Sequence, residues 1–325
     1  MVTRKATKTT GVLLTAVGGP HSLDEVEPFL IDIRGGRPTS PELVAEFRER
    51  YAKIGGKSPL LEISTAQAKA LEARLNEDGG SFRCYVGMRN WTPRISDVYA
   101  KMVSDGIDRI IVLPLTPYHS SRSVGAYFRA VQEAEAKAGV PMDLTYVESW
   151  NTEPALIEAF VAKTRQALDR LAARGHPDPV VLFTAHSLPR KLMEEGDDYE
   201  KELLETKARI LVQLPPVRSG MAWQSAGRTP EPWLGPSLEA VLEDLGKVGE
   251  GAVLVVPFGF ISDHLELLYD LDIEARGTAT RLGMAFERTG SLNTDPTFIG
   301  AMANAVRAAL SAPSTPRSGS GGRRT

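Results

Sequence analysis

Short, continuously apolar runs alternate with longer amphipathic segments along most of this chain. Runs without polar alternation are typical of strands buried on both faces of a parallel sheet. The runs that we predict to be strands cover residues 11–17, 84–88, 109–115, 143–149, 179–185, 221–225 and 252–258. The segments that we predict to be helices cover residues 40–54, 67–77, 94–106, 154–173 and 236–246, the first of them with Ser40 as its N-cap and Pro41 at its first position. This alternation predicts an α/β fold with mostly parallel sheets flanked by helices.

The length of the chain and a break in the pattern favour two domains. The 325 residues fit two domains of ordinary size, and the segment 148–154 separates two similar series of strands and helices. We therefore predict an N-terminal domain over residues 11–150 and a C-terminal domain over residues 151–310. Residues 1–10 and 311–325 are polar, and we expect both ends to be disordered because they have little to bury.

The composition excludes several classes of protein. A net charge of −3 and a pI of about 6 argue against nucleic-acid binding. Cys84 is the single cysteine, so one chain can form neither an internal disulfide nor an iron–sulfur cluster held by four cysteines. The early apolar run "VLLTAV" is too short for a membrane span or a signal-peptide core, and we expect the protein to be cytoplasmic.

Candidate site residues follow two of the predicted strands. In open α/β sheets, ligands bind beyond the carboxyl ends of the strands, where this chain has His186 and, further on, Glu266, Asp270 and Glu274 at intervals of four. On an α-helix these three carboxylates share one face, although each like-charged pair costs about 0.2–0.5 kcal/mol. Histidine with carboxylates suits exchangeable binding of iron(II), cobalt(II), zinc or manganese, and histidine also accepts protons near neutral pH.

Each of these features also has a plain structural explanation. His186 could simply bond to nearby backbone, and the carboxylates could form a solvated helix face. Their occurrence together at two strand ends favours a site. His264 competes as a ligand, but it lies two residues before Glu266 and is expected on another face. The chain lacks the G-x-G-x-x-G, G-x-x-x-x-G-K-[ST] and G-x-S-x-G motifs, which leaves dinucleotide binding, phosphate binding and serine hydrolysis unsupported.

Five collinear segments resemble the ferrochelatase family. They are "GVLLTAVGGPHSLDEVEPFL", "RYAKIGGKSPLLEISTAQA", "VLFTAHSLP", "WQSAGRTPEPWLGP" and "PFGFISDHLELLYDLDIEA", and the resemblance runs from about residue 11 to residue 310. It implies insertion of ferrous iron into a porphyrin held in a cleft between two Rossmann-like domains. It also implies that His186 and Glu266 are catalytic and bind the metal, while Asp270 and Glu274 deliver metal or carry protons away.

The similarity around residues 32–38 and 48–60 is greatest to the coproporphyrin III ferrochelatases of Gram-positive bacteria. By that match the residues at the porphyrin are Val17, Arg34, Arg50, Tyr51, Ser58 and Tyr127. Two positions depart from the pattern of these relatives. Val17 stands where many have a tyrosine able to ligate the product iron, and Gly35 stands where some have a second arginine. A phenolate ligand from the first loop is therefore not expected.

The resemblance implies coproporphyrin III as substrate and coprohaem as product, with protoporphyrin IX as the alternative. A cobalt chelatase keeps the fold but often uses more histidines at its metal site, and the whole of this chain has only five. A non-catalytic tetrapyrrole- or metal-binding protein is the alternative from a different class. We expect porphyrin and ferrous iron as substrates, no tightly bound cofactor, no nucleic acid, a monomer, and the next haem-pathway enzyme as a candidate partner.

Overall fold

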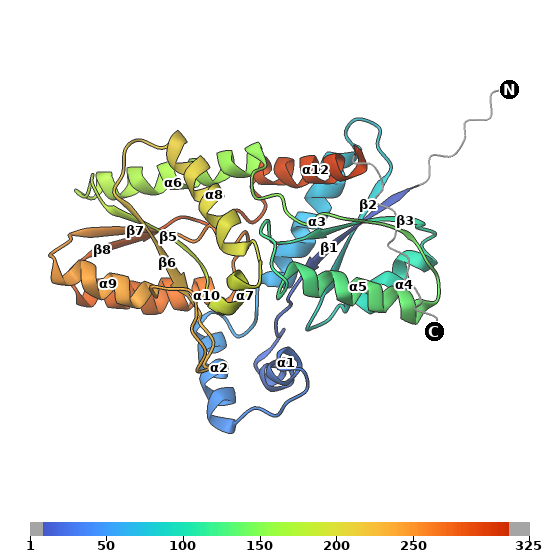
Figure 1. Cartoon of the computed structure of the whole chain (residues 1–325), viewed down its shortest axis with the longest axis horizontal. Helices are drawn as coiled ribbons and strands as arrows, with labels where there is room; N and C mark the ends of the chain where they lie inside the picture. The colour runs from blue at the N-terminus through green and yellow to red at the C-terminus, as the bar shows by residue number, and fades with distance from the viewer. Residues whose placement is uncertain (1–8, 312–325) are drawn as a thin grey trace.

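The computed structural model describes residues 9–311 and contains two four-stranded parallel sheets side by side (Figure 1). The first sheet has the order β2-β1-β3-β4, with β1 Thr10–Ala16, β2 Phe82–Met88, β3 Arg109–Pro114 and β4 Asp143–Tyr146. The second has the order β6-β5-β7-β8, with β5 Val180–His186, β6 Ser219–Gln224, β7 Ala252–Val256 and β8 Ala285–Arg288. All seven predicted strands are confirmed. The strand β8 was not predicted, because four residues at a sheet edge give little periodic signal.

Helices cover both sides of the sheets and carry the chain from one parallel strand to the next. In the first half they are η1 Leu23–Glu25, α1 Val26–Ile33, α2 Pro41–Lys53, α3 Leu60–Asn76, α4 Ile95–Ser104 and α5 Val124–Ala138. In the second half they are α6 Pro154–Ala173, α7 Arg190–Glu194, α8 Tyr199–Gln213, α9 Leu238–Lys247, α10 Leu265–Leu268, η2 Asp270–Ala275, α11 Arg276–Arg281 and α12 Pro296–Ser311. Within residues 9–311, none of these helices combines the length and apolar composition needed to span a bilayer.

The two halves share one hydrophobic core. Its largest cluster of buried side chains includes Val12 and Ile111 from the first sheet and Phe183 and Leu254 from the second. The last helix, α12, returns from the second half and packs against α3 and β3 of the first as well as against α6 (Figure 1). The predicted disordered ends fall outside the described residues, apart from residues 9, 10 and 311.

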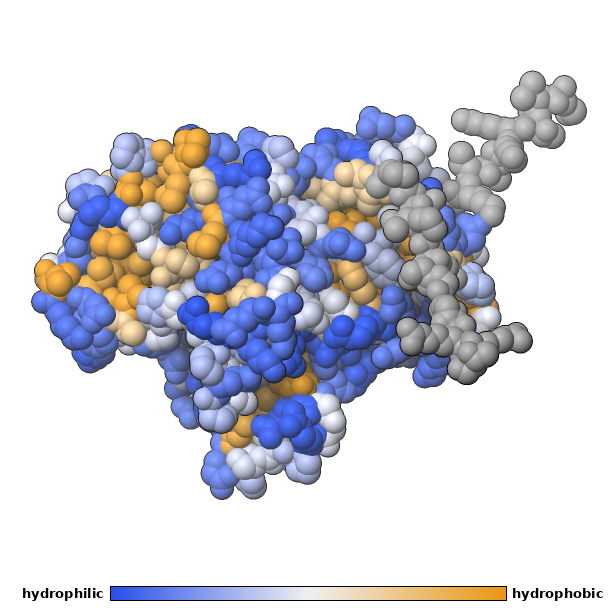
Figure 2. Space-filling view, viewed as in Figure 1, coloured by the Kyte–Doolittle hydropathy of each residue, from blue (hydrophilic) through white to orange (hydrophobic). Residues whose placement is uncertain are grey.

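The helices α1 and α2 project away from the sheets and contact the second half (Figure 1). The predicted start of α2 is confirmed, since the Ser40 hydroxyl accepts a hydrogen bond from the Leu43 amide at 3.3 Å. A separate cluster of buried side chains joins α1 and α2 to α10 and Tyr269; it consists of Val26, Leu30, Val44, Tyr51, Leu265 and Tyr269. Figure 2 shows apolar surface exposed between the projecting helices. This cluster fixes α2 against the segment that carries Glu266.

Close approach of β5 and the segment after β7 brings the two candidate strand ends together. The Gly259 amide donates to the Thr184 carbonyl at 3.1 Å. A Cβ on Gly259 would lie 2.5 Å from the Cβ and 2.7 Å from the Cα of Ala185. Glycine is needed here for space rather than for its backbone conformation, because the obstructing atoms include backbone that cannot move aside.

We therefore expect Gly259→Ala to lower the free energy of unfolding by about 1–3 kcal/mol through overpacking. Gly277→Ala in α11 is the matched control, because a Cβ there meets no atom within 4 Å. That control should gain about 0.5–1 kcal/mol from the higher helix propensity of alanine. Urea unfolding of both variants measures the difference, and a Gly259→Ala protein as stable as the wild type would refute the packing argument.

Candidate active site

His186 is the last residue of β5 and lies at the carboxyl edge of the second sheet. Its Nδ1 is in hydrogen-bonding contact with the Ser187 carbonyl. Because a carbonyl only accepts, the neutral ring carries its proton on Nδ1 and has a lone pair on Nε2. That Nε2 lies 3.8 Å from Oε1 of Glu266. The side chains remain 35% and 31% exposed, so a substrate can reach both.

Glu266 lies in the first turn of α10, and two neighbours hold its backbone. Its amide donates to Nδ1 of His264 at 3.3 Å, and its carbonyl accepts from the Gln224 side-chain amide at 3.2 Å. The carboxylate oxygen Oε2 is buried and has no hydrogen-bond partner among the described residues. A buried, unpaired carboxylate oxygen is costly, and an incoming cation would satisfy it. This arrangement fits transient binding of a divalent metal.

His264 is the N-cap residue of α10, and its Nδ1 accepts the Glu266 amide proton. Its ring also contacts the ring of Phe260, with centroids 4.7 Å apart. Burial lowers the pKa of His264 despite the nearby carboxylates Glu266 and Asp263. His264 therefore stays uncharged at neutral pH. Its local role is to cap the helix that presents Glu266.

The prediction that Glu266, Asp270 and Glu274 lie along one α-helix is wrong. The α-helix α10 ends at Leu268, and η2 over Asp270–Ala275 is a π-helix. The Glu274 amide donates to the Tyr269 carbonyl, five residues back, at 3.0 Å. The π-helix changes the angle between successive side chains, so a spacing of four no longer aligns them. Within residues 9–311, no three His, Cys, Asp or Glu side chains come close enough to hold one metal ion.

Arg50 of α2 binds the two distal carboxylates. Its guanidinium lies 3.4 Å from Asp270, 3.8 Å from Glu274 and 3.0 Å from Glu46. It also stacks over the ring of Tyr269, with Cζ 4.9 Å from the centroid. The predicted place of Arg50 at the porphyrin stays a prediction; in this structure its charge is paired with carboxylates of the protein. Arg50 thus joins α2 of the first half to η2 of the second half.

Strand β8 supplies a second arginine that the sequence analysis missed. The Arg288 side chain binds Asp272 through two nitrogens, at 2.9 and 2.7 Å, and lies 3.5 Å from Asp263. Asp272 lies in the π-helix and Asp263 directly precedes His264, so Arg288 holds the chain on both sides of Glu266. Two charge-assisted bonds from one planar guanidinium fix orientation as well as distance.

The other residues predicted at the porphyrin are Tyr51, Ser58, Val17, Tyr127 and Arg34. Tyr51 is buried, and burial and then the Glu266 charge raise the pKa of its hydroxyl. Ser58 is buried against Gly19. Gly19 lies in the loop after β1, and that loop begins with the exposed Val17. Tyr127 is also buried, and burial raises its pKa to about 12, partly offset by Arg89. Arg34 follows α1 and is exposed. Within residues 9–311, neither Tyr127 nor Arg34 makes a hydrogen bond or ion pair with His186 or Glu266.

Further residues at the site were missed, and two of them lie in a predicted strand. The Tyr199 hydroxyl donates to the His186 carbonyl at 3.1 Å, and burial raises the pKa of that hydroxyl. The Ser225 hydroxyl donates to Asp270 at 2.9 Å, and Gln224 precedes it at the end of β6. The end of a predicted strand was the available signal for Gln224 and Ser225.

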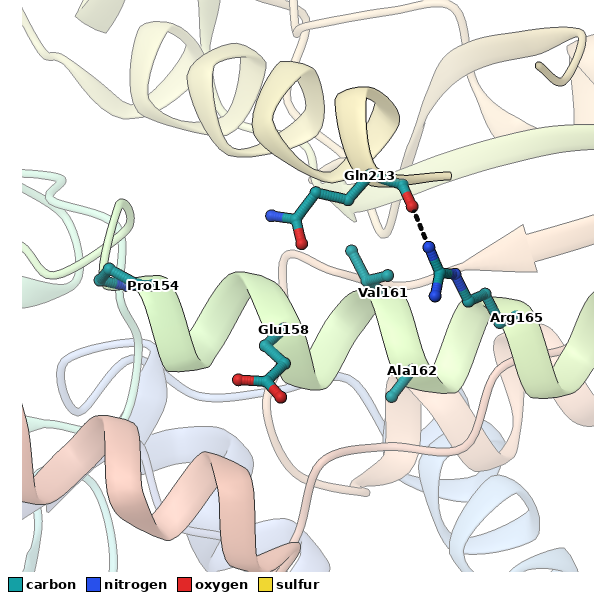
Figure 3. Close-up of a pocket in the computed structure, with 6 residues that line it drawn as sticks. All are labelled: Pro154, Glu158, Val161, Ala162, Arg165 and Gln213. Atoms are coloured by element: carbon teal, nitrogen blue, oxygen red, sulfur yellow. Dashed lines mark hydrogen bonds between the residues drawn. The ribbon is translucent and has the colours of Figure 1, made fainter. Parts of the chain in front are cut away.

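A surface pocket of about 470 Å³ lies elsewhere, between α6 and α8 (Figure 3). It is lined by Pro154, Glu158, Val161, Ala162, Arg165 and Gln213. Figure 3 shows the Arg165 guanidinium donating to the Gln213 carbonyl across it. None of the predicted site residues lines this pocket, and it is separate from the His186–Glu266 pair.

The burial of Asp270 makes stability depend on pH. Burial, followed by the Glu266 charge, raises the pKa of Asp270 from 3.8 to about 7. Between these values the unfolded chain is ionised at Asp270 while the folded chain keeps the proton. Raising the pH from about 4 to 7 therefore lowers the free energy of unfolding, and above pH 7 this loss stays constant.

We accordingly expect Asp270→Asn to raise the free energy of unfolding at pH 8 by about 2 kcal/mol, a value reduced for remaining solvent exposure. The difference from the wild type should shrink towards zero near pH 4, where Asp270 is protonated in both states. Urea unfolding at several pH values measures it. A difference independent of pH would mean that Asp270 is ionised throughout.

Known proteins match this chain over nearly its whole length. The ferrochelatase family model matches residues 9–310. "Ferrochelatase" from Deinococcus radiodurans is 40% identical over 308 residues, covering 94% of this chain and 98% of that relative. "Coproporphyrin III ferrochelatase" from Anoxybacillus flavithermus is 40% identical over 302 residues, covering 92% of this chain and 96% of that relative.

Solved structures of chelatases share the fold. SirB from Bacillus subtilis with Fe³⁺ has a TM-score of 0.59 at 13% identity, covering 93% of this chain and 96% of that one. The sirohydrochlorin chelatase SirB from Bacillus subtilis subspecies spizizenii, in complex with cobalt, has a TM-score of 0.57 at 12% identity, covering 93% and 95%. These similarities concern the fold alone. From the family model and the relatives at 40% identity, the chain belongs to the ferrochelatase family.

Proposed function

We propose that this enzyme inserts ferrous iron into coproporphyrin III to give coprohaem. The observation that carries the proposal is the pairing of a histidine lone pair with a carboxylate whose second oxygen is unpaired, His186 and Glu266 at 3.8 Å. Metal insertion needs a base for the two pyrrole protons and negative charge for the incoming dication. The pair offers both at one accessible place, without a tightly bound cofactor.

His186 accepts pyrrole protons at Nε2, because its Nδ1 is held by the Ser187 carbonyl. Glu266 provides the charge that balances the dication as the ring loses its protons. Tyr51 and Tyr199 stay protonated near this charge, since burial raises the pKa of both hydroxyls, and so they add no competing anion. Asp270, with a pKa of about 7, can take up and release protons near neutral pH. In this proposal it carries protons from the site towards solvent.

Two observations support coproporphyrin III over protoporphyrin IX. Relatives named coproporphyrin III ferrochelatase are 37–40% identical over at least 92% of this chain, although other relatives carry the broader name. Arg34 is exposed and has no ion-pair partner within residues 9–311, so its charge is available for a propionate. Coproporphyrin III has four propionates and protoporphyrin IX has two, so cationic groups at the porphyrin favour the former.

The substrate proposal is tested by anaerobic insertion of ferrous iron into both porphyrins in parallel. We expect coproporphyrin III to be metallated with the higher kcat/KM. Arg34→Ala should narrow the difference, because it removes a cation that binds a propionate, while Arg37→Ala, a nearby exposed arginine, is the control. Equal or better use of protoporphyrin IX by the wild type would overturn the substrate assignment and leave the chelatase assignment standing.

The roles at the metal are tested by four substitutions. His186→Ala should reduce insertion about 10²–10⁴-fold while porphyrin still binds, because a general base is lost. Glu266→Gln should also be severe, since it keeps the shape and removes the charge. Asp270→Asn and Glu274→Gln should act more mildly, mainly on the iron concentration needed. Rates are measured against iron concentration, with porphyrin affinity from fluorescence quenching.

A His186→Ala protein with near-normal insertion would contradict the proposed mechanism. If the wild type binds porphyrin tightly but inserts no iron, the alternative of a non-catalytic tetrapyrrole-binding protein is favoured instead. Porphyrin binding is expected of both a chelatase and a non-catalytic binding protein, so the insertion rate is the measurement that distinguishes them.

A further inference from the structure

Gln224 is the last residue of β6, and it is paired in register with His186, the last residue of β5. Residues paired across neighbouring parallel strands point their side chains to the same face of the sheet. Gln224 therefore extends from the carboxyl edge beside His186. It is only 3% exposed, which is unusual for a residue with two polar groups to satisfy.

The orientation of the Gln224 amide is fixed by its one hydrogen bond. Its Nε2 donates to the Glu266 backbone carbonyl at 3.2 Å. A carbonyl cannot donate, so exchanging the nitrogen and oxygen of the amide would place two acceptors against each other. The oxygen Oε1 must therefore point away from the Glu266 carbonyl. It is buried and has no partner among the described residues.

Two unpaired, buried oxygens thus belong to residues that are bonded to each other. One is Oε1 of Gln224 and the other is Oε2 of Glu266. Buried acceptors are usually paired, and these two belong to residues joined by a hydrogen bond, so one cation between them would satisfy both. The same region contains the His186 Nε2 lone pair, 3.8 Å from the other Glu266 oxygen. A divalent cation accepts oxygen and imidazole donors together.

We propose that the Gln224 side-chain oxygen contacts the metal substrate, as a neutral ligand beside His186 and Glu266. This inference rests on the proposed function and adds a third donor to the same site. A neutral amide oxygen helps to replace the water that the ion loses, without adding a second negative charge. The ion is then held less firmly than by two carboxylates, which suits a metal that must move on into the porphyrin.

Two substitutions distinguish a role of the Gln224 side-chain oxygen from a role of the hydrogen bond that Gln224 donates to the Glu266 carbonyl. Gln224→Leu removes both the oxygen and the amide donor. Gln224→Glu keeps oxygen at this position but, when ionised, loses the donor to the Glu266 carbonyl. If Gln224 only positions Glu266, Gln224→Leu should leave the shape of the cobalt bands unchanged, because the ion keeps the same ligands. If Gln224 contacts the metal, Gln224→Leu should change the band shape and lose affinity, whereas Gln224→Glu should keep the affinity.

The measurement is a titration of the porphyrin-free protein with cobalt(II), followed by its visible d–d absorption. For Gln224→Leu we expect affinity about tenfold weaker and a changed band shape, whereas Gln224→Glu should bind as tightly as the wild type or more tightly. Gln67→Leu is the matched control, because Gln67 is also fully buried with an unpaired Oε1 but donates to Ser262 and Asn293. Its cobalt spectrum should be unchanged.

Insertion assays complete the test. Gln224→Leu should raise KM for ferrous iron about tenfold with little change in porphyrin affinity. An unchanged cobalt spectrum in Gln224→Leu, or equal losses in the leucine and glutamate variants, would overturn the inference. Either result is compatible with a working chelatase. A wild type that inserts no iron would instead defeat the proposed function itself.

Discussion

The Arg50 guanidinium resolves the main electrostatic difficulty of this structure. Asp270 and Glu274 repel each other and Glu266, and burial of Asp270 makes its charge costlier. Arg50 reaches both from α2 and stacks on the ring of Tyr269, which joins the first half of the chain to the acidic helix. Arg50 binds the two distal carboxylates and not Glu266, whose Oε2 has no hydrogen-bond partner within residues 9–311. Arg50 thus distinguishes Asp270 and Glu274, which it reaches, from Glu266, which it does not.

Much of the fold could be predicted because its signals are local. Buried parallel strands are apolar at successive positions, and Ser40 with Pro41 begins α2 as expected. The short edge strand β8 has no such signal, yet it supplies Arg288. The π-helix also escaped prediction, since the sequence of 270–275 fits an ordinary helix and tertiary contacts such as the Arg288–Asp272 pair accompany the change.

The site was predictable where a residue type implies chemistry and a strand end implies position. His186 and Glu266 satisfy both conditions, and the structure brings them together. The substrate contact suggested for Arg50 stays a prediction. Its pairing with Asp270 and Glu274 could not be predicted, because it depends on how α2 packs, and that is decided by the buried cluster of α1, α2 and α10. Gln224 was missed because an amide has no distinctive chemistry until its neighbours are known.

The chain around the two unpaired oxygens is held by contacts on several sides. A site that holds unsatisfied acceptors would relax by turning them towards nearby donors if its backbone could move. Here the Glu266 amide is held by His264, its carbonyl by Gln224, and the flanking chain by Arg288. The tight contact of Gly259 with Ala185 fixes the approach of the segment after β7 to β5. These contacts keep the two oxygens from turning towards donors of the protein, as the proposed metal contact requires.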